Sequence, residues 1–322
     1  MREAAFIKAN REKWQEIDEQ TQNKEISAEA LADNFIELTD DLSYARTFYP
    51  KSQTVRYLNQ LAGRYFMNIY KYRKREKGRF VRFWKTELPL IMHKYRRHML
   101  FSFLFFIASV LLGAFSQWQD PEFANLILSP GYVNMTIDNI ESGDPMAVYK
   151  QSDEAPMLFF ISTNNIKVDF FTFLGGIFGG IGTLIILLQN GVMVGVFQYF
   201  FIERGLFAES ALAIWLHGTL EMSGMIIAAG AGFVLGNSLL FPGSYKRLDS
   251  LMRGAKDALK IIIGLLPVTF LAAIIESYLT RMTHLPVYFN LTIIILSGIF
   301  ILWYFFYYPY RVYKKLNKAI QE

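Results

Sequence analysis

The sequence predicts an all-α protein in two parts: a soluble N-terminal helical region, residues 1–98, followed by a six-helix transmembrane bundle, residues 99–322. Composition is the first observation behind this prediction, because hydrophobic residues make up 52% of the chain and aromatic residues 16%. Distribution is the second. The apolar residues are concentrated in long runs after residue 98, whereas the residues before it are mostly polar and charged.

The N-terminal region carries apolar side chains at the three- and four-residue spacing of amphipathic helices. Three helices are expected. The second should begin after Ser27, a good N-cap residue, and end before Pro50, which disfavours helix in the residue preceding it. We interpret the basic run at residues 71–79 as a solvated face near anionic lipid headgroups, since no nucleic-acid-binding signature accompanies it. The aromatic and basic residues 80–98 are predicted to form a helix on the membrane surface.

Several classes of chemistry are excluded or disfavoured. The chain contains no cysteine, which excludes disulfides, thiol catalysis and thiolate metal sites. The N-terminus lacks the apolar core of a cleavable signal peptide. The N-terminal region has no glycine-rich phosphate loop, nucleophile motif or cluster of catalytic acids, so we expect a docking module for a cytoplasmic partner and not an enzyme. No cofactor and no nucleic-acid partner are expected.

The membrane domain is divided by its polar loops. Spans are predicted near residues 99–116, 168–188, 191–206, 211–240, 258–280 and 287–308. Residues 117–166 form an extracytoplasmic segment between the first two spans. Asn190 and Gly191 are interpreted as a turn. Because the stretch after this turn is short, residues 168–206 are either two full crossings or a re-entrant pair.

Charge sets the predicted orientation. Residues 1–98 contain 20 Lys and Arg, whereas residues 117–166 contain seven acidic residues against one lysine. The positive-inside rule therefore places both termini in the cytoplasm and residues 117–166 outside. Six crossings keep every basic loop on the cytoplasmic side, which favours this number over five.

Glycines within the predicted spans indicate close helix packing, because small residues allow backbones to approach. The glycines assigned to this role are Gly175, Gly176, Gly179, Gly180, Gly224 and Gly232.

Ionisable and amide side chains inside apolar segments mark the candidate site. The predicted polar cluster in the outer half of the bundle consists of His217, Glu221, Glu276, Asp169, Asn164 and Asn165. Such groups are expensive in a bilayer, by about 3 kcal/mol each on insertion scales, and are expected to face one another. Three interpretations remain open: structural pairing between helices, a relay or binding pocket for an ion or lipid-borne ligand, and a metal site held by His217, Glu221 and Glu276. A single HxxxE motif is a weak metal signature, so we favour structural pairing and predict no metal.

Several short motifs occur along the chain in an order that resembles a known family. These are Asn164-Asn165-Ile166, the glycine-rich second span, Gln189-Asn190-Gly191, His217-Gly218-Thr219-Leu220-Glu221, Phe241-Pro242-Gly243 and Ala272-Ala273-Ile274-Ile275-Glu276. They are similar to the stage II sporulation protein M family of bacterial integral membrane proteins. The resemblance implies a multi-pass protein of the bacterial cytoplasmic (inner) membrane. The sporulation member of the family is a membrane component of a peptidoglycan-remodelling complex and looks like an organiser of partner enzymes, so the resemblance implies a similar role here.

Taken together, these features predict a membrane scaffold or assembly component of a cell-envelope complex. They favour a protein without enzymatic activity over an enzyme. Its expected partners are the lipid bilayer, other envelope membrane proteins and a cytoplasmic protein at the N-terminal region, and a homo-oligomer is compatible with the sequence. The alternatives are a transporter or lipid- or ion-handling protein, or an intramembrane metalloenzyme, each using the polar cluster.

Overall fold

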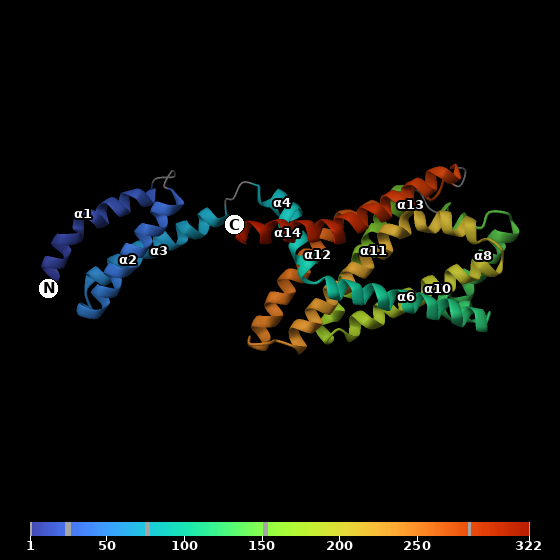
Figure 1. Ribbon diagram of the computed structural model, residues 1–322, viewed down its shortest axis with the longest axis horizontal. Coiled ribbons are helices and arrows are strands. Elements are labelled where there is room, and N and C mark those ends of the chain that lie inside the picture. Colours follow the sequence, from blue (N-terminus) through green and yellow to red (C-terminus); the bar gives the residue numbers. More distant parts are fainter. Residues whose placement is uncertain (1, 23–26, 75–77, 151–153, 283–284, 322) are drawn as a thin grey trace. The chain divides into compact units, whose positions relative to one another are not determined.

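The computed structural model describes residues 2–22, 27–74, 78–150, 154–282 and 285–321, and every regular element within these ranges is helical (Figure 1). The chain forms two compact units, Met1–Phe80 and Val81–Glu322. The division falls earlier than the predicted boundary at residue 98, because the residues just after it pack into the second unit.

The first unit is a three-helix assembly. Its helices are α1 (Glu3–Gln22), α2 (Ala28–Phe48) and α3 (Gln53–Lys74). Ser27 caps α2 as predicted, with its hydroxyl oxygen accepting a hydrogen bond from the amide of Ala30. Two buried rings are anchored by polar atoms: the Trp14 indole donates to Asp41 at 2.8 Å, and the Tyr65 hydroxyl donates to the carbonyl of Ile17 at 2.8 Å. The unit therefore has a core of its own.

The second unit begins with short helical segments packed against its long helices. These are α4 (Arg79–Arg82), the π-helical turn η1 (Phe83–Glu87) and α5 (Leu88–Lys94). Glu87 pairs with Lys260 at 2.8 Å, Leu88 is fully buried, and the Tyr304 hydroxyl donates to the carbonyl of Trp84. The segment predicted to lie on the membrane surface is thus fixed to the rest of the unit by specific contacts.

Five helices in the described ranges are long and apolar enough to cross a membrane, so the structure supports a multi-pass helical protein but not the predicted count of six. They are α6 (Arg96–Gln119), α10 (Ile181–Glu203), α11 (Phe207–Leu240), α12 (Arg247–Ile274) continued by the π-helix η4 (Ile275–Leu279), and α13 (Val287–Leu302) continued by η5 (Trp303–Tyr307) and α14 (Tyr308–Gln321).

The segment predicted to be extracytoplasmic, residues 117–166, is largely helical in the structure. It contains α7 (Phe123–Leu128), α8 (Pro130–Glu141) and η2 (Ala147–Lys150), and α9 (Glu154–Leu174) already begins within it. Asn164 and Asn165 therefore lie inside a helix, not in a loop before a span.

The turn predicted at Asn190–Gly191 is wrong, because both residues lie within the continuous helix α10. The chain instead reverses after the 3-10 turn η3 (Gly175–Phe178), at Gly179 and Gly180. These two glycines have φ angles of 66° and 91°, in the left-handed region that only glycine adopts without strain. The helices over this region are accordingly α9 and α10, with bounds that differ from the predicted 168–188 and 191–206, and of the two only α10 is among the five helices that could cross a membrane.

Gly191 has a packing role instead. A Cβ atom at Gly191 would lie 2.5 Å from the Cβ of Ser109, and one at Gly195 would collide with the backbone of Val110. Both contacts join α10 to α6, which run side by side (Figure 1). The Asn190 amide donates to the carbonyl of Ile186 one turn earlier, so the polar side chain is satisfied within its own helix.

Helix α11 is the centre of the second unit. It contacts α6, α9, α10, α12 and α13, and all of its residues from Gly224 to Gly236 are buried. A Cβ at Gly232 would lie 2.8 Å from the carbonyl oxygen of Thr172, and a Cβ at Gly176 would collide with the carbonyl of Gly232. Gly224 is less tightly packed, because its nearest neighbours would be 3.7 Å from an added Cβ.

Candidate functional site

Three ionisable side chains of the predicted cluster converge inside the second unit. His217 and Glu221 lie one turn apart on α11, and Glu276 lies on η4. One ligand atom from each of these three residues lies within 4.8 Å of the other two. His217 is 5% exposed, and its Nε2 lies 3.8 Å from Oε1 of Glu276. The group is called the HEE triad below.

A threonine orients the imidazole of the triad. Nδ1 of His217 lies 3.0 Å from the hydroxyl oxygen of Thr280, which also lies 3.4 Å from the carbonyl of Ile275. A hydroxyl has a single proton. When Thr280 donates that proton to Ile275, its oxygen accepts from the Nδ1–H of His217, and the imidazole presents a lone pair at Nε2, facing Glu276.

The π-helical geometry of η4 positions the second half of the site. Thr280 closes this turn by donating its amide to the carbonyl of Ile275, five residues earlier. A π-helical turn inserts an extra residue into an α-helix, and such insertions are frequent at functional sites. Here the turn presents both Glu276 and Thr280 to His217.

Asp169 forms a second polar contact in the same bundle. It is 7% exposed, and its Oδ2 accepts a hydrogen bond of 2.7 Å from Thr269 on α12. Thr269 precedes Glu276 by seven residues, which is about 10 Å along a helix. The contact of Asp169 is therefore about two helical turns from Glu276, although Asp169 is within electrostatic range of Glu221. This contact joins α9 to α12.

Among the interactions of the described residues, neither asparagine is bonded to the triad. Asn165 is buried, and its side-chain nitrogen has no hydrogen-bond partner among the residues described. Asn164, the preceding residue on α9, is exposed. The predicted cluster thus separates into the triad, the Asp169–Thr269 pair and two asparagines with different surroundings.

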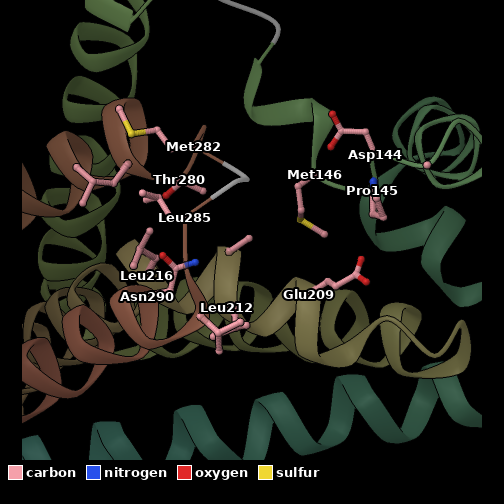
Figure 2. Close-up of a pocket in the computed structure, with 14 residues that line it drawn as sticks. Asp144, Pro145, Met146, Glu209, Leu212, Leu216, Thr280, Met282, Leu285 and Asn290 are labelled. Carbon is pink, nitrogen blue, oxygen red and sulfur yellow. The ribbon is translucent and has the colours of Figure 1, made fainter.

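A pocket of about 550 Å³ adjoins the HEE triad (Figure 2). Its wall includes Thr280, the hydrogen-bond partner of His217, and Leu216, the preceding residue on α11. Asp144 and Glu209 also line it, and Figure 2 shows their carboxylates across the pocket from Thr280. The pocket lies at the end of the bundle that carries the segment between α6 and α9.

A second pocket, of about 580 Å³, lies near the first residues of α6 and is lined by α5, η5 and α14. His93 stacks on Tyr313 there, with ring centroids 4.0 Å apart. Burial and the nearby Arg96 hold the pKa of His93 below its ordinary value, which favours the neutral ring. Lys94 at this pocket is paired with Asp257 at 2.7 Å.

A sequence model of the family described as Stage II sporulation protein M matches residues 102–281, which run from α6 to just beyond η4. The chain belongs to this family. The Stage II sporulation protein M match contains all the residues of the predicted cluster. A model described as a domain of unknown function (DUF8413) matches residues 4–71, within the first unit.

A relative within the curated proteins is the uncharacterized protein MJ0793 of Methanocaldococcus jannaschii. It is 36% identical over 123 residues, which cover 37% of this chain and 68% of the relative. No solved structure matches the chain.

Sequence reasoning missed the two threonine partners of the site. Thr269 and Thr280 are hydrogen-bonded to Asp169 and His217, but neither has a motif of its own. The available signal was their spacing from Glu276, since residues 269, 276 and 280 recur at the helical interval. The pocket was not predictable, because its lining comes from three separate parts of the chain, 143–146, 209–216 and 279–290.

Proposed function

We propose that this protein is an assembly component of a cell-envelope complex, in which the membrane bundle anchors the protein and the three-helix unit binds a cytoplasmic protein partner. The division of the chain into two units supports this role, because the first unit has its own core and its own family model. The family name, Stage II sporulation protein M, is consistent with a role among envelope proteins.

The observation that best supports the docking role is that several large apolar side chains of the first unit are exposed outside its core. Ile36, Phe66 and Met67 are 57%, 56% and 52% exposed. Ile36 adjoins Phe35, whose ring lies 6.3 Å from that of Phe66, so α2 and α3 present these side chains on neighbouring surface. Exposed large apolar groups on a small helical unit are suited to a protein interface.

The docking role is tested by charging this surface in the full-length protein. The double change Ile36→Asp and Phe66→Asp should remove co-purifying cytoplasmic proteins after cross-linking in the native cell, because aspartate is unfavourable in an apolar interface. Glu12→Lys, a change at another exposed position of the same unit, is the matched control. Membrane levels should be equal for all forms. A set of cross-linked proteins that is the same for the double variant and the wild type would count against docking.

We also propose that α9 crosses the membrane as a sixth span. The chain passes along the length of α11 between Met146 and Gly180: Met146 lines the pocket with Glu209, whereas a Cβ at Gly236 would lie 2.6 Å from the amide of Gly180. Glu209 and Gly236 are separated by about 40 Å of helix. Among the described residues between Met146 and Gly180, α9 is the one long helix, and its length supports a crossing.

With six spans, we infer from the lysine and arginine distribution that both termini lie on the cytoplasmic side of the inner membrane and that the pocket lies outside. Cysteine labelling tests this in a chain that has no native cysteine. Ser142 and Ser244 are both exposed. A membrane-impermeant maleimide should label Ser142→Cys in intact cells and should label Ser244→Cys only after lysis. Labelling of Ser244→Cys in intact cells would contradict the six-span topology.

A further inference from the structure

We propose that His217, Glu221 and Glu276 bind one divalent transition-metal ion within the membrane bundle, a site for which Zn²⁺ is the natural probe. This binding function goes beyond the assembly role, since it resides in the second unit of the protein, whereas the docking surface belongs to the first. The proposal stands on the convergence of ligands, their orientation, their charge and an access route.

The spacing of the ligand atoms is close to what a metal requires. In a tetrahedral zinc site, nitrogen and oxygen ligands lie about 2.0–2.2 Å from the ion and so about 3.4 Å from one another. The three atoms of the HEE triad lie within 4.8 Å of one another before any adjustment. If rotation of the two glutamate side chains moves their carboxylate oxygens by about 1 Å, the three ligand atoms reach the spacing that one ion requires.

The imidazole is held in the orientation that metal ligation needs. Metal-binding histidines use one ring nitrogen as the ligand and bond the other to a neighbouring group, which fixes the ring. Thr280 provides this second contact to Nδ1 at 3.0 Å, and Nε2 faces Glu276. The arrangement places the imidazole lone pair and the carboxylate oxygens around a common centre.

The charge of the triad favours a dication. Glu221 and Glu276 are close enough to interact electrostatically, and two like charges in an apolar bundle destabilise each other. A divalent ion neutralises both carboxylates at once, which no hydrogen bond between them achieves. One nitrogen and two carboxylate ligands suit zinc, manganese and iron(II). Calcium and magnesium prefer sites in which every ligand atom is oxygen.

The pocket in Figure 2 supplies a route for the ion. Its wall at Thr280 directly adjoins His217, and the carboxylates of Asp144 and Glu209 line it farther out. Acidic groups along a concave surface raise the local concentration of cations. Three protein ligands also leave a fourth position of a zinc ion for water or a polar ligand that enters from the pocket.

Equilibrium metal binding to the full-length protein tests the proposal. The detergent-purified chain, carrying an affinity tag without histidine, is dialysed against Zn²⁺ and analysed for metal and protein. Uptake should saturate at about one ion per chain. Co²⁺ in place of Zn²⁺ should give visible absorption bands of a coordinated ion, a measurement on the wild type that needs no variant. Wild-type protein with neither saturable Zn²⁺ uptake nor Co²⁺ bands would overturn the proposal.

Graded variants separate coordination from general attraction of cations. His217→Ala and Glu276→Gln each remove a ligand and should weaken Zn²⁺ binding by more than about 100-fold, whereas Thr280→Val removes only the orienting contact and should weaken it by about 10–100-fold. Asp169→Asn is the matched control, because it neutralises a buried acid outside the triad and should leave one ion bound. Full Zn²⁺ binding by both ligand variants would identify an adventitious site and overturn the assignment.

Discussion

The close contact between η3 and α11 gives a sharp prediction for a single methyl group. A Cβ added at Gly176 would collide with the carbonyl oxygen of Gly232 and lie 2.8 Å from its carbonyl carbon. Non-bonded carbon atoms prefer about 3.5–4.0 Å, so Gly176→Ala must separate the two segments by about 1 Å. The neighbouring atom is backbone and cannot rotate away.

The expected cost follows from overpacking. Forcing an extra carbon into a packed interior costs about 1–3 kcal/mol, and the same separation weakens the van der Waals contacts that hold helices together in lipid. For a folded unit of the size of Val81–Glu322, each kcal/mol corresponds to roughly 2–4 °C in the unfolding temperature. Gly176→Ala should therefore unfold several degrees below the wild type.

The assay is thermal unfolding of the purified protein in detergent, followed by tryptophan fluorescence. Gly298→Ala is the matched control within the same bundle, because the nearest atom to its added Cβ, in Thr219, lies 4.0 Å away. This control should unfold at the wild-type temperature or up to a few degrees higher, since alanine favours helix over glycine by about 1 kcal/mol. Equal unfolding temperatures for the two alanine variants would refute the packing argument.

Two further predictions concern polar contacts. Thr269→Val keeps the side-chain volume but removes the hydrogen bond to Asp169, so it should destabilise the bundle by about 1–3 kcal/mol, whereas the exposed Thr292→Val should change stability by less than about 0.5 kcal/mol in the same unfolding assay. The hydrogen bond from Lys260 holds the pKa of Glu87 below its ordinary value of 4.5. Because the folded chain then binds this proton less tightly than the unfolded chain, stability should fall as the pH drops through the region below about 4.5. Glu87→Gln should make that fall shallower, and identical pH profiles for variant and wild type would show that the pair contributes nothing.

The features that were predictable from the sequence depend on local periodicity. His217 and Glu221 are separated by four residues, so one helix face necessarily holds both. Glu276 reached the same site because the positions of α11 and α12 follow from two long apolar runs joined by a basic loop. The family assignment was also predictable, since its motifs occur in order along the chain.

The turn between α9 and α10 shows where local signals compete. Asn-Gly is a strong turn signal, so the turn was predicted at Asn190–Gly191. The structure uses Gly191 for close contact with Ser109 of α6, a requirement that lies in a different part of the chain. Gly179 and Gly180 were assigned to packing, although their left-handed backbone makes them the turn. Both roles call for glycine, so residue type alone does not distinguish them.

Helix α9 was misplaced for a different reason. Asn164, Lys167 and Asp169 interrupt its apolar pattern, which moved the predicted span toward the uninterrupted glycine-rich stretch. In the structure the helix runs through them, because Asp169 is satisfied by Thr269 while Asn164 and Lys167 are exposed. Partners on distant helices decide whether a polar residue is tolerated, and a single sequence does not reveal them.

The most direct test of the proposed metal site is the location of a bound ion in an experimental structure. Diffraction data collected on both sides of the zinc absorption edge, from crystals of the wild-type protein equilibrated with Zn²⁺, would provide it. We expect an anomalous difference peak between Nε2 of His217 and the carboxylates of Glu221 and Glu276. Maps with no peak there, and with the three side chains bonded only to one another, would contradict it.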